Sequence, residues 1–364
     1  MKSLIQSILL FLLCGITSNQ SAAQPVFSCC ATDDTHVSRP DEHAPISVMG
    51  DHTHAKGGWM ASYRYMHMNM EGMRQGENRI STSDVFAEGY AVSPESMTMD
   101  MHMLGLMYGF SDELTLTFMS SYIESEMDHS VSPMVAGMIN RGATEFTTRV
   151  SGIGDTKIGG LYRFFLKGNQ KAHFGLSVSV PTGSIDKKDF TPGPGGPATR
   201  RLPAAMQLGS GTVDLLPSVT YVQQFETASF GLQANAIVRL EDENSNGYRF
   251  GNVFGLTTWG GYTLNRWLAL NLGLNYTYTG ELRGTQENIN QTAMMGMRTI
   301  PTAFNQNYGG ERVDSILGLN FYVPQGTLKD HRLAIDVRLP VWQDLNGEQL
   351  ETDFSLTIGW QAAF

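Results

Sequence analysis

The 364-residue chain has little charge, little cysteine and no long apolar run beyond its N-terminus. Charged residues make up 16% of it, against roughly 25% in soluble domains. No apolar run reaches the 18 or so residues that a membrane-spanning helix requires, and glycine follows neither a collagen period nor a coiled-coil heptad. The formal net charge of −10 argues against nucleic acid as a partner, because phosphate binding needs a basic surface. These absences leave an exported, strand-rich protein as the leading class.

The N-terminus has the pattern of a secretory signal. Lys2 precedes the apolar stretch 4–16, which Ser21-Ala22-Ala23 follows as a small-x-small cleavage motif. Leu13 precedes Cys14 where a lipoprotein would have a small residue. We therefore expect residues 1–23 to be a signal peptide that is cleaved after Ala23.

From Trp59 onward the chain alternates apolar and polar residues at period 2. In Trp267–Thr279, leucines and tyrosines hold one parity, and Ala, Asn, Gly and Thr hold the other. This alternation gives a strand two chemically different faces. It predicts twelve strands, at residues 59–73, 97–110, 114–127, 153–166, 172–182, 212–225, 229–240, 251–264, 267–281, 312–323, 331–340 and 352–364.

Strand length and connections favour a membrane barrel over a soluble sandwich. Globular strands usually run about 5–6 residues, whereas longer strands suit a tilted bilayer crossing. Short turns alternate with long connections, as in outer-membrane barrels. The long connections lie at residues 74–96, 128–150, 183–211, 241–250, 282–309 and 340–351. The sequence predicts an all-β antiparallel transmembrane barrel of about 12 strands over residues 58–364, set in the lipid bilayer of the cell outer membrane, with short periplasmic turns and long outer loops.

The last strand carries a terminal signal. Apolar side chains occupy every second position from Phe354 to the final Phe364. This pattern resembles the signal by which bacterial outer-membrane barrels are assembled. We therefore expect the barrel-assembly machinery to be a partner that recognises the strand ending in Phe364.

Several short glycine-rich motifs point to a family. They are Gly152-Ile153-Gly154-Asp155 followed by Tyr162-Arg163-Phe164, Val180-Pro181-Thr182-Gly183, and Leu208-Gly209-Ser210-Gly211 with Asp214 after it. Together they resemble the outer-membrane channel family labelled for the meta-pathway of phenol degradation, a relative of the fatty-acid and aromatic-hydrocarbon channels. The resemblance implies passage of small molecules, no enzymatic activity and no catalytic residues.

Methionine is concentrated in the first third of the chain. Arg64 is expected in the lumen, because an arginine that faces lipid at mid-membrane costs about 2–4 kcal/mol. Its parity, and the matching parities of the next two strands, turn ten methionines inward. These are Met60, Met66, Met68, Met70, Met97, Met99, Met101, Met103, Met107 and Met119.

The methionine wall has two competing functional interpretations. Thioethers are soft ligands for Cu(I) or Ag(I), so the wall is a candidate path or binding surface for these ions, although no cofactor is required. Methionine is also a flexible apolar filler, which would suit passage of a hydrophobic or aromatic solute. Packing without any role in transport is a third interpretation. The remaining strands are expected to line the opposite wall with Asp155, Lys157, Arg163, Asp214, Arg239, Asp314, Asp336 and Arg338.

Residues 24–57 are polar and strandless, and we expect them to form a periplasmic tail outside the barrel. Imidazole and thiolate bind first-row metals. The tail's candidate ligands are Cys29, Cys30, His36, His43, His52 and His54. A solvated tail whose histidines bind nothing is the alternative interpretation, because the spacing lacks a fixed metal-site pattern.

An outer-membrane acyl hydrolase is a remote alternative function. His102 and Asp100 share the outward parity, and the tight turn at 110–113 would bring His102 opposite Ser120 or Tyr122. A serine nucleophile needs a base and an orienting acid. Asp100 lies only two residues from His102 and no oxyanion donor is evident, so we expect no enzymatic activity.

Overall fold

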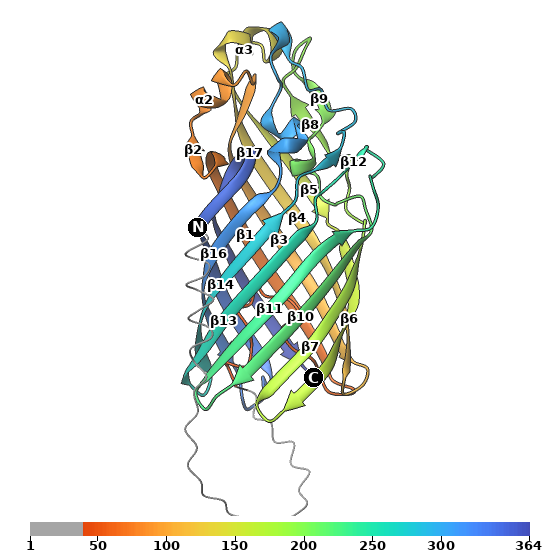
Figure 1. The fold of residues 1–364 in the computed structure, drawn as a ribbon, viewed down its shortest axis with the longest axis vertical. Helices are drawn as coiled ribbons and strands as arrows, with labels where there is room; N and C mark the ends of the chain where they lie inside the picture. The colour runs from red at the N-terminus through yellow and green to blue at the C-terminus, as the bar shows by residue number, and fades with distance from the viewer. Residues whose placement is uncertain (1–38) are drawn as a thin grey trace, which may run out of the picture. The chain divides into compact units, whose positions relative to one another are not determined.

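The computed structural model describes residues 39–364, and these form a closed antiparallel barrel (Figure 1). Eleven strands complete the ring, in which each strand pairs with the next and the last returns to the first. They are β1 (Trp59–Gly76), β3 (Val92–Gly109), β4 (Leu114–Val131), β6 (Thr156–Lys167), β7 (Gln170–Val180), β10 (Asp214–Gln224), β11 (Ala228–Arg239), β13 (Val253–Asn265), β14 (Leu268–Thr279), β16 (Gly310–Tyr322) and β17 (His331–Ala363). The predicted all-β barrel is confirmed.

The last strand, β17, crosses the barrel wall twice. Its first half pairs antiparallel with β16 up to Leu345, and its second half, from Leu345 onward, pairs antiparallel with β1. Gln343 and Thr352 exchange hydrogen bonds, and Gly347 between them has a φ of 58°. The chain therefore reverses inside β17, which gives the even number of crossings that an all-antiparallel ring requires. The loop predicted at 340–351 is wrong, because a tight Asn346-Gly347 turn lets both flanks stay in the sheet.

The two faces of the wall differ as the alternation predicts. On β3, Leu104 and Leu106 are 62% and 46% exposed, whereas Met103, which has the opposite parity, is buried. Large apolar side chains that face outward recur on the other ring strands, among them Leu272 and Leu317. An outward apolar band and an inward mixed face are typical of a barrel surrounded by lipid.

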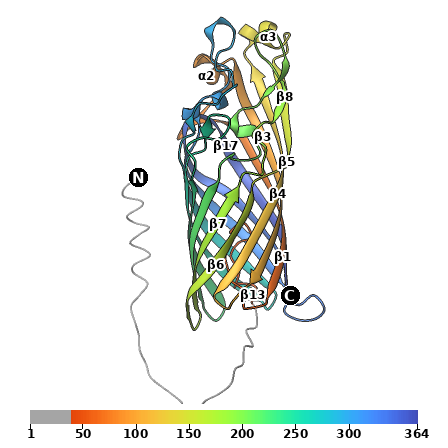
Figure 2. The ribbon, with the colours of Figure 1, turned by 90° about the vertical axis from the view of Figure 1, so that its right-hand side faces the viewer.

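Short turns and long loops lie at opposite ends of the barrel (Figures 1 and 2). We call these the turn end and the loop end. The loop end carries the short elements of the chain: β2 (Asn78–Ile80), α2 (Thr82–Ala87), α3 (Pro133–Ile139), β8 (Lys188–Thr191), β9 (Ala198–Arg201), η1 (Ala204–Met206), β12 (Tyr248–Arg249), β15 (Arg283–Gly284), η2 (Met294–Gly296), η3 (Pro301–Ala303) and η4 (Asn305–Asn307). None of the helices among residues 39–364 is long and apolar enough to cross a membrane.

The wall rises above the ring on one side. Beyond its pairing with β6, β4 continues to Val131 and pairs with β5 (Glu145–Ile153). The interval 128–150 predicted as loop therefore contains strand on both sides of α3. This extension forms because residues 145–153 keep enough alternation to pair with the long β4.

Residues 39–54 lie inside the barrel and residues 55–57 are exposed at its turn end, which corrects the expectation that this segment is a tail outside the barrel. Ala44, Ile46 and Val48 are almost fully buried, and so are Asp41 and Asp51. The segment is strandless, as predicted, but its backbone bonds to side chains that point inward from the wall. We call residues 39–57 the plug.

Candidate functional site: the lumen and its plug

Side chains of the last two strands hold one side of the plug. The Asn320 amide on β16 donates to the carbonyl oxygens of Pro40 and His43, at 3.3 and 2.9 Å. Arg332 on β17 donates to the Ala44 carbonyl oxygen and to the Asn320 side-chain oxygen. These bonds satisfy plug carbonyls that would otherwise be buried without a partner.

Further anchors from β17, and one from β11, hold residues 47–49 of the plug. Ser47 donates its backbone N–H to Asp336 at 2.8 Å, and its hydroxyl lies 2.9 Å from the Arg338 Nε. Across the lumen, the Gln233 amide on β11 donates to the Met49 carbonyl oxygen at 2.9 Å. Bonds from opposite walls fix the plug across the pore.

An apolar contact completes the anchoring. Trp259 on β13 is 2% exposed and clusters with Ala44 and Val48 of the plug and with Val222 of β10. Its ring lies over Gly231, where an added Cβ would come within 2.1 Å of the ring. A glycine is therefore required on β11 for the indole to reach the plug.

The methionine wall has the register that parity predicts. On β1 and β3, Met66 pairs with Met101, and the two pairs above it are Met68 with Met99 and Met70 with Met97. Directly opposite residues in antiparallel strands have Cβ atoms about 4.5–5.5 Å apart. The structure thus forms a ladder of three cross-strand methionine pairs; Arg64 and Met103 form the next inward pair toward the turn end.

The surroundings of the methionine ladder change along the barrel axis. Near the loop end, Met97 and Met99 pack in an apolar cluster with Leu202 and Leu208 from a loop that folds inward. Nearer the plug, a cavity of about 130 Å³ is bordered by methionines and guanidinium groups: Met66, Met68 and Met103 with Arg64, Arg312 and Arg338. The three remaining inward methionines, Met60, Met107 and Met119, line a larger cavity of about 260 Å³.

Most of the predicted polar wall is engaged in internal pairs. Asp214 pairs with Arg239, and Asp314 pairs with Arg312. Asp155 accepts hydrogen bonds from the backbone of Gly183 and from Ser210, which ties the inward loop to the wall. Asp336 and Arg338 hold the plug as described above, and Arg163 lines a cavity at the turn end.

Two cations of this wall have no such partner. Arg64 is buried. Among residues 39–364, the side chains of Arg64 and Lys157 make neither a hydrogen bond nor an ion pair. The nearest carboxylates to Arg64, those of Asp51 and Asp336, are bound by other groups. Both cations line the cavity of about 260 Å³ that the plug closes on the side of the turn end.

The cavities follow one another along the lumen. At the loop end, a chamber of about 540 Å³ is lined partly by Met127, His129 and Met206. The cavities of about 130 and 260 Å³ share Met49 and Arg64 as lining residues. A further cavity of about 260 Å³ lies at the turn end beside the plug histidines. The plug therefore separates two compartments of the lumen.

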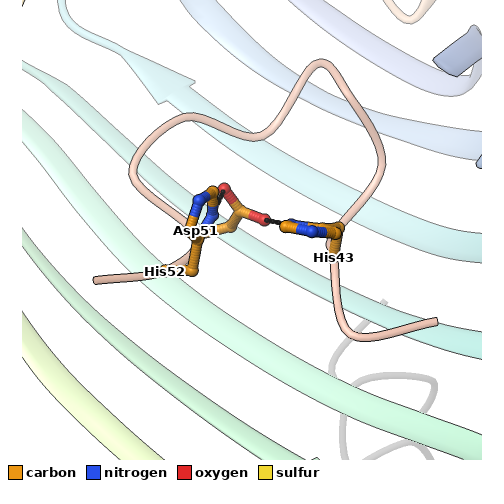
Figure 3. Close-up of side chains that lie close together, drawn as sticks. All are labelled: His43, Asp51 and His52. Atoms are coloured by element: carbon orange, nitrogen blue, oxygen red, sulfur yellow. Dashed lines mark hydrogen bonds and ion pairs between the residues drawn. The ribbon is translucent and has the colours of Figure 1, made fainter. Parts of the chain in front are cut away.

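The plug also gathers histidines. His52 lies 2.8 Å from Asp51 and His43 lies 3.7 Å from it, and the ring of His54 is 4.9 Å from that of His52 (Figure 3). Burial lowers the pKa of His43 to about 4 and that of His54 to about 3, so both rings are neutral near pH 7. Burial opposes the charge on Asp51, but attraction to His52 and contact with His43 hold its pKa well below the usual value. The other predicted tail ligands, Cys29, Cys30 and His36, fall outside the described residues.

The acyl-hydrolase set does not assemble. His102 pairs in register with Tyr122, one of the two expected partners, and its Nδ1 lies 2.7 Å from the Tyr63 hydroxyl. Ser120 pairs with Leu104, and its hydroxyl lies 3.5 Å from that of Thr156. The serine therefore has no base.

Sequence reasoning missed three residues that hold the plug. Arg332 shares parity with Asp336 and Arg338, so the alternation of β17 could have placed it in the lumen. Asn320 and Trp259 face inward on β16 and β13. No sequence signal links them to residues 39–57, because plug and strands are far apart along the chain.

One solved structure of another protein shares this architecture. The crystal structure of an outer membrane channel from Pseudomonas putida F1 matches with a TM-score of 0.58 and 16% identity, over 88% of this chain and 100% of that chain. The toluene transporter TbuX of Ralstonia pickettii gives a TM-score of 0.41 at 8% identity, over 85% of this chain and 90% of that one. The toluene transporter TodX of Pseudomonas putida gives 0.40 at 10% identity, over 89% and 92%. A search of curated proteins returns no match.

A family model covers more than half of the chain. It carries the description "Putative MetA-pathway of phenol degradation" and matches residues 103–297. That interval runs from β3 to η2 and contains all three of the glycine-rich motifs. The resemblance drawn from those motifs is confirmed: the chain belongs to the family described as the putative MetA-pathway of phenol degradation.

Proposed function

We propose that this protein is a plugged outer-membrane channel for small apolar solutes that carry a negative charge, with aromatic carboxylates as the solute class. The observation that carries the proposal is the pair of unpartnered cations, Arg64 and Lys157, in a cavity walled on one side by methionine. A barrel of twelve crossings is intermediate between side-chain-filled and open barrels. The lumen of a barrel of that size admits small solutes.

The anionic part of the proposal follows from charge. A buried cation without a partner is costly, so such a group is normally paired. Arg64 and Lys157 have no ion pair within residues 39–364, and the nearby Arg338 is bound to plug Ser47. A carboxylate entering this cavity would supply the missing partner, and a guanidinium binds it in two-pronged geometry.

The apolar part follows from the methionines that line the cavity beside these cations. Met60, Met107 and Met119 line the same cavity, and thioether side chains adapt to irregular apolar shapes. An apolar cavity of about 150 Å³ is enough to hold benzene. The cavity of about 260 Å³ therefore has room for one aromatic ring and its carboxylate. The phenol-degradation description of the family is consistent with an aromatic solute.

Current block in planar bilayers tests the proposal. Benzoate at pH 8 should block the wild-type current at lower concentration than benzamide, which has the same ring without the charge. The double variant Arg64→Gln/Lys157→Gln should raise the half-blocking benzoate concentration at least tenfold and leave benzamide unchanged. Arg163→Gln is the matched control, because Arg163 lines the cavity at the turn end instead. Equal benzoate block in wild type and double variant would refute the assignment.

Passage or binding of Cu(I) or Ag(I) is the second candidate function. It rests on the three cross-strand methionine pairs, since soft cations prefer thioether ligands. The charge of the surroundings weighs against it, because three guanidinium groups and only one carboxylate, that of Asp314, border the cavity that Met66 and Met68 line. Aliphatic neighbours at the other end of the ladder favour the apolar interpretation.

Substituting leucine for methionine removes the sulfur but keeps the size of the side chain, which separates the two candidate functions. A variant with leucine at the six ladder positions and at the adjoining Met103 keeps the apolar volume and loses the soft ligands; the positions are Met66, Met68, Met70, Met97, Met99, Met101 and Met103. Stoichiometric Ag(I) binding that disappears in this variant would support the metal path. Unchanged benzoate block with no Ag(I) binding in either protein would eliminate it.

A further inference from the structure

The plug carries a compact set of metal-binding groups. One ligand atom from each of His43, Asp51 and His52 lies within 4.8 Å of the other two (Figure 3). The Asp51 carboxylate is held by the backbone N–H of Ala44, at 3.1 Å, so its orientation is fixed by the plug itself. The rings of His43 and His52 meet edge to face with centroids 4.8 Å apart.

Two imidazole nitrogen atoms of the plug are buried without a hydrogen-bond partner. They are Nδ1 of His43 and Nε2 of His54. In folded proteins most buried side-chain polar atoms have a hydrogen-bond partner, and each exception requires an explanation. A cavity of about 260 Å³ adjoins the cluster and is lined by His43, Asp51, His52 and His54. The cluster therefore combines unsatisfied donor atoms with space beside them.

We infer that His43, Asp51 and His52 form a binding site for a divalent first-row transition ion of the Zn²⁺ class, with His54 placed to complete it. Imidazole nitrogen and carboxylate oxygen are the usual ligands of such ions, at about 2.0–2.2 Å. Two imidazoles in a set of three disfavour Ca²⁺ and Mg²⁺, which prefer oxygen ligands. The inference does not depend on which solute the channel passes.

An ion at this position would act on the plug. His43 and Asp51 bracket residues 44–50, and this loop contacts the wall through Ala44, Ser47 and Met49. Linking the two ends of the loop through one ion restricts the conformations in which those contacts are broken. Metal loading should therefore hold the plug closed, and chelation should loosen it.

Titration of the purified full-length chain in detergent with Co²⁺, after removal of bound metal by a chelator, tests the site. Tetrahedral Co²⁺ gives visible absorption bands, and competition with Zn²⁺ then yields the Zn²⁺ affinity. We expect one site per chain, and at least a tenfold loss of affinity in each of His43→Ala and His52→Ala. His54→Ala should change the Co²⁺ spectrum.

The matched control is His67→Ala. His67 and Asp100 lie 2.8 Å apart, the same separation as His52 and Asp51. Among residues 39–364, however, no third histidine, cysteine or carboxylate completes a cluster with them. This variant should bind Co²⁺ like wild type. Heat-dependent electrophoretic mobility verifies that each variant is folded.

A second full-length variant excludes ligands that precede the plug. Cys29→Ser/Cys30→Ser/His36→Ala should retain the site with unchanged stoichiometry. Loss of binding in this triple variant, or undiminished binding in His43→Ala/His52→Ala, would overturn the inference. As an independent measurement, Zn²⁺ should slow amide hydrogen exchange of residues 44–50 in wild type and leave it unchanged in His52→Ala. Exchange that does not respond to Zn²⁺ in wild type would refute the proposed effect on the plug.

Discussion

Asn320→Leu should release the plug, whereas Asn271→Leu should not. Both asparagines are fully buried in the lumen, on the neighbouring strands β16 and β14. The Asn320 amide makes two bonds to plug carbonyls and accepts one from Arg332. Neither polar atom of the Asn271 side chain has a protein partner. The same substitution therefore removes three plug-related bonds at one position and none at the other.

The magnitude follows from the groups left unpaired. Asn320→Leu strands the carbonyl oxygens of Pro40 and His43 and one N–H of Arg332. A buried group left without its partner costs about 1–3 kcal/mol. Counted at about 1–2 kcal/mol each, in the lower part of that range because the bond to Pro40 is long at 3.3 Å, three such groups give roughly 3–6 kcal/mol. Since about 1.4 kcal/mol is a factor of ten, the released state should gain roughly 10²- to 10⁴-fold in population.

Amide hydrogen exchange of plug residues 39–57 measures that population directly, because exchange tracks local opening. The plug amides should exchange roughly 10²- to 10⁴-fold faster in Asn320→Leu. Asn271→Leu should exchange like wild type. Single-channel recordings should show more frequent large openings in the first variant only. If both variants exchange like wild type, these hydrogen bonds do not hold the plug and the reasoning is wrong.

Three other changes test the wall, the apolar contact and the terminal strand. Leu232 lies on the outward face of β11, so Leu232→Arg should lower the free energy of unfolding by about 2–4 kcal/mol in a reversible lipid-folding assay if the position is near the midplane. Asn235→Arg places its side chain in the lumen cavity and should cost clearly less. Equal costs would contradict the assignment of the faces. Trp259→Ala should destabilise the barrel by about 3–5 kcal/mol, and a denaturation midpoint like that of wild type would show that its contact with the plug carries no energy. Phe364→Asp should lower the amount of folded barrel in outer-membrane fractions while Phe364→Tyr does not, and equal amounts would remove the terminal aromatic from the assembly signal.

The strands were predictable because one rule governs them. Lipid on one side and lumen on the other impose period 2, so parity alone placed Met66 and Met101 on the same face. The strand order follows from the chain order, since each strand pairs with its neighbour in sequence. The turn inside β17 was missed because its polar residues, around Asn346-Gly347, resemble a loop although the dipeptide favours a tight hairpin.

The plug was not predictable by the same rule. Residues 39–57 have no periodicity, and their partners are scattered over β7, β11, β16 and β17. A polar segment before a barrel is equally compatible with a solvated tail. The decisive information lies in buried groups such as Asn320 and Arg332, whose need for partners becomes evident only when the ring is closed.

The seam between β1 and β17 has a consequence for biogenesis. The plug is synthesised before any strand, yet Asn320, Arg332 and Asp336, which anchor it, belong to the last two strands. The second half of β17 also pairs with β1 and so closes the ring. The strands that complete the ring thus also supply the side chains that anchor the plug. Because the same strands close the ring and anchor the plug, we expect the pore to be closed by the plug as soon as the barrel is complete.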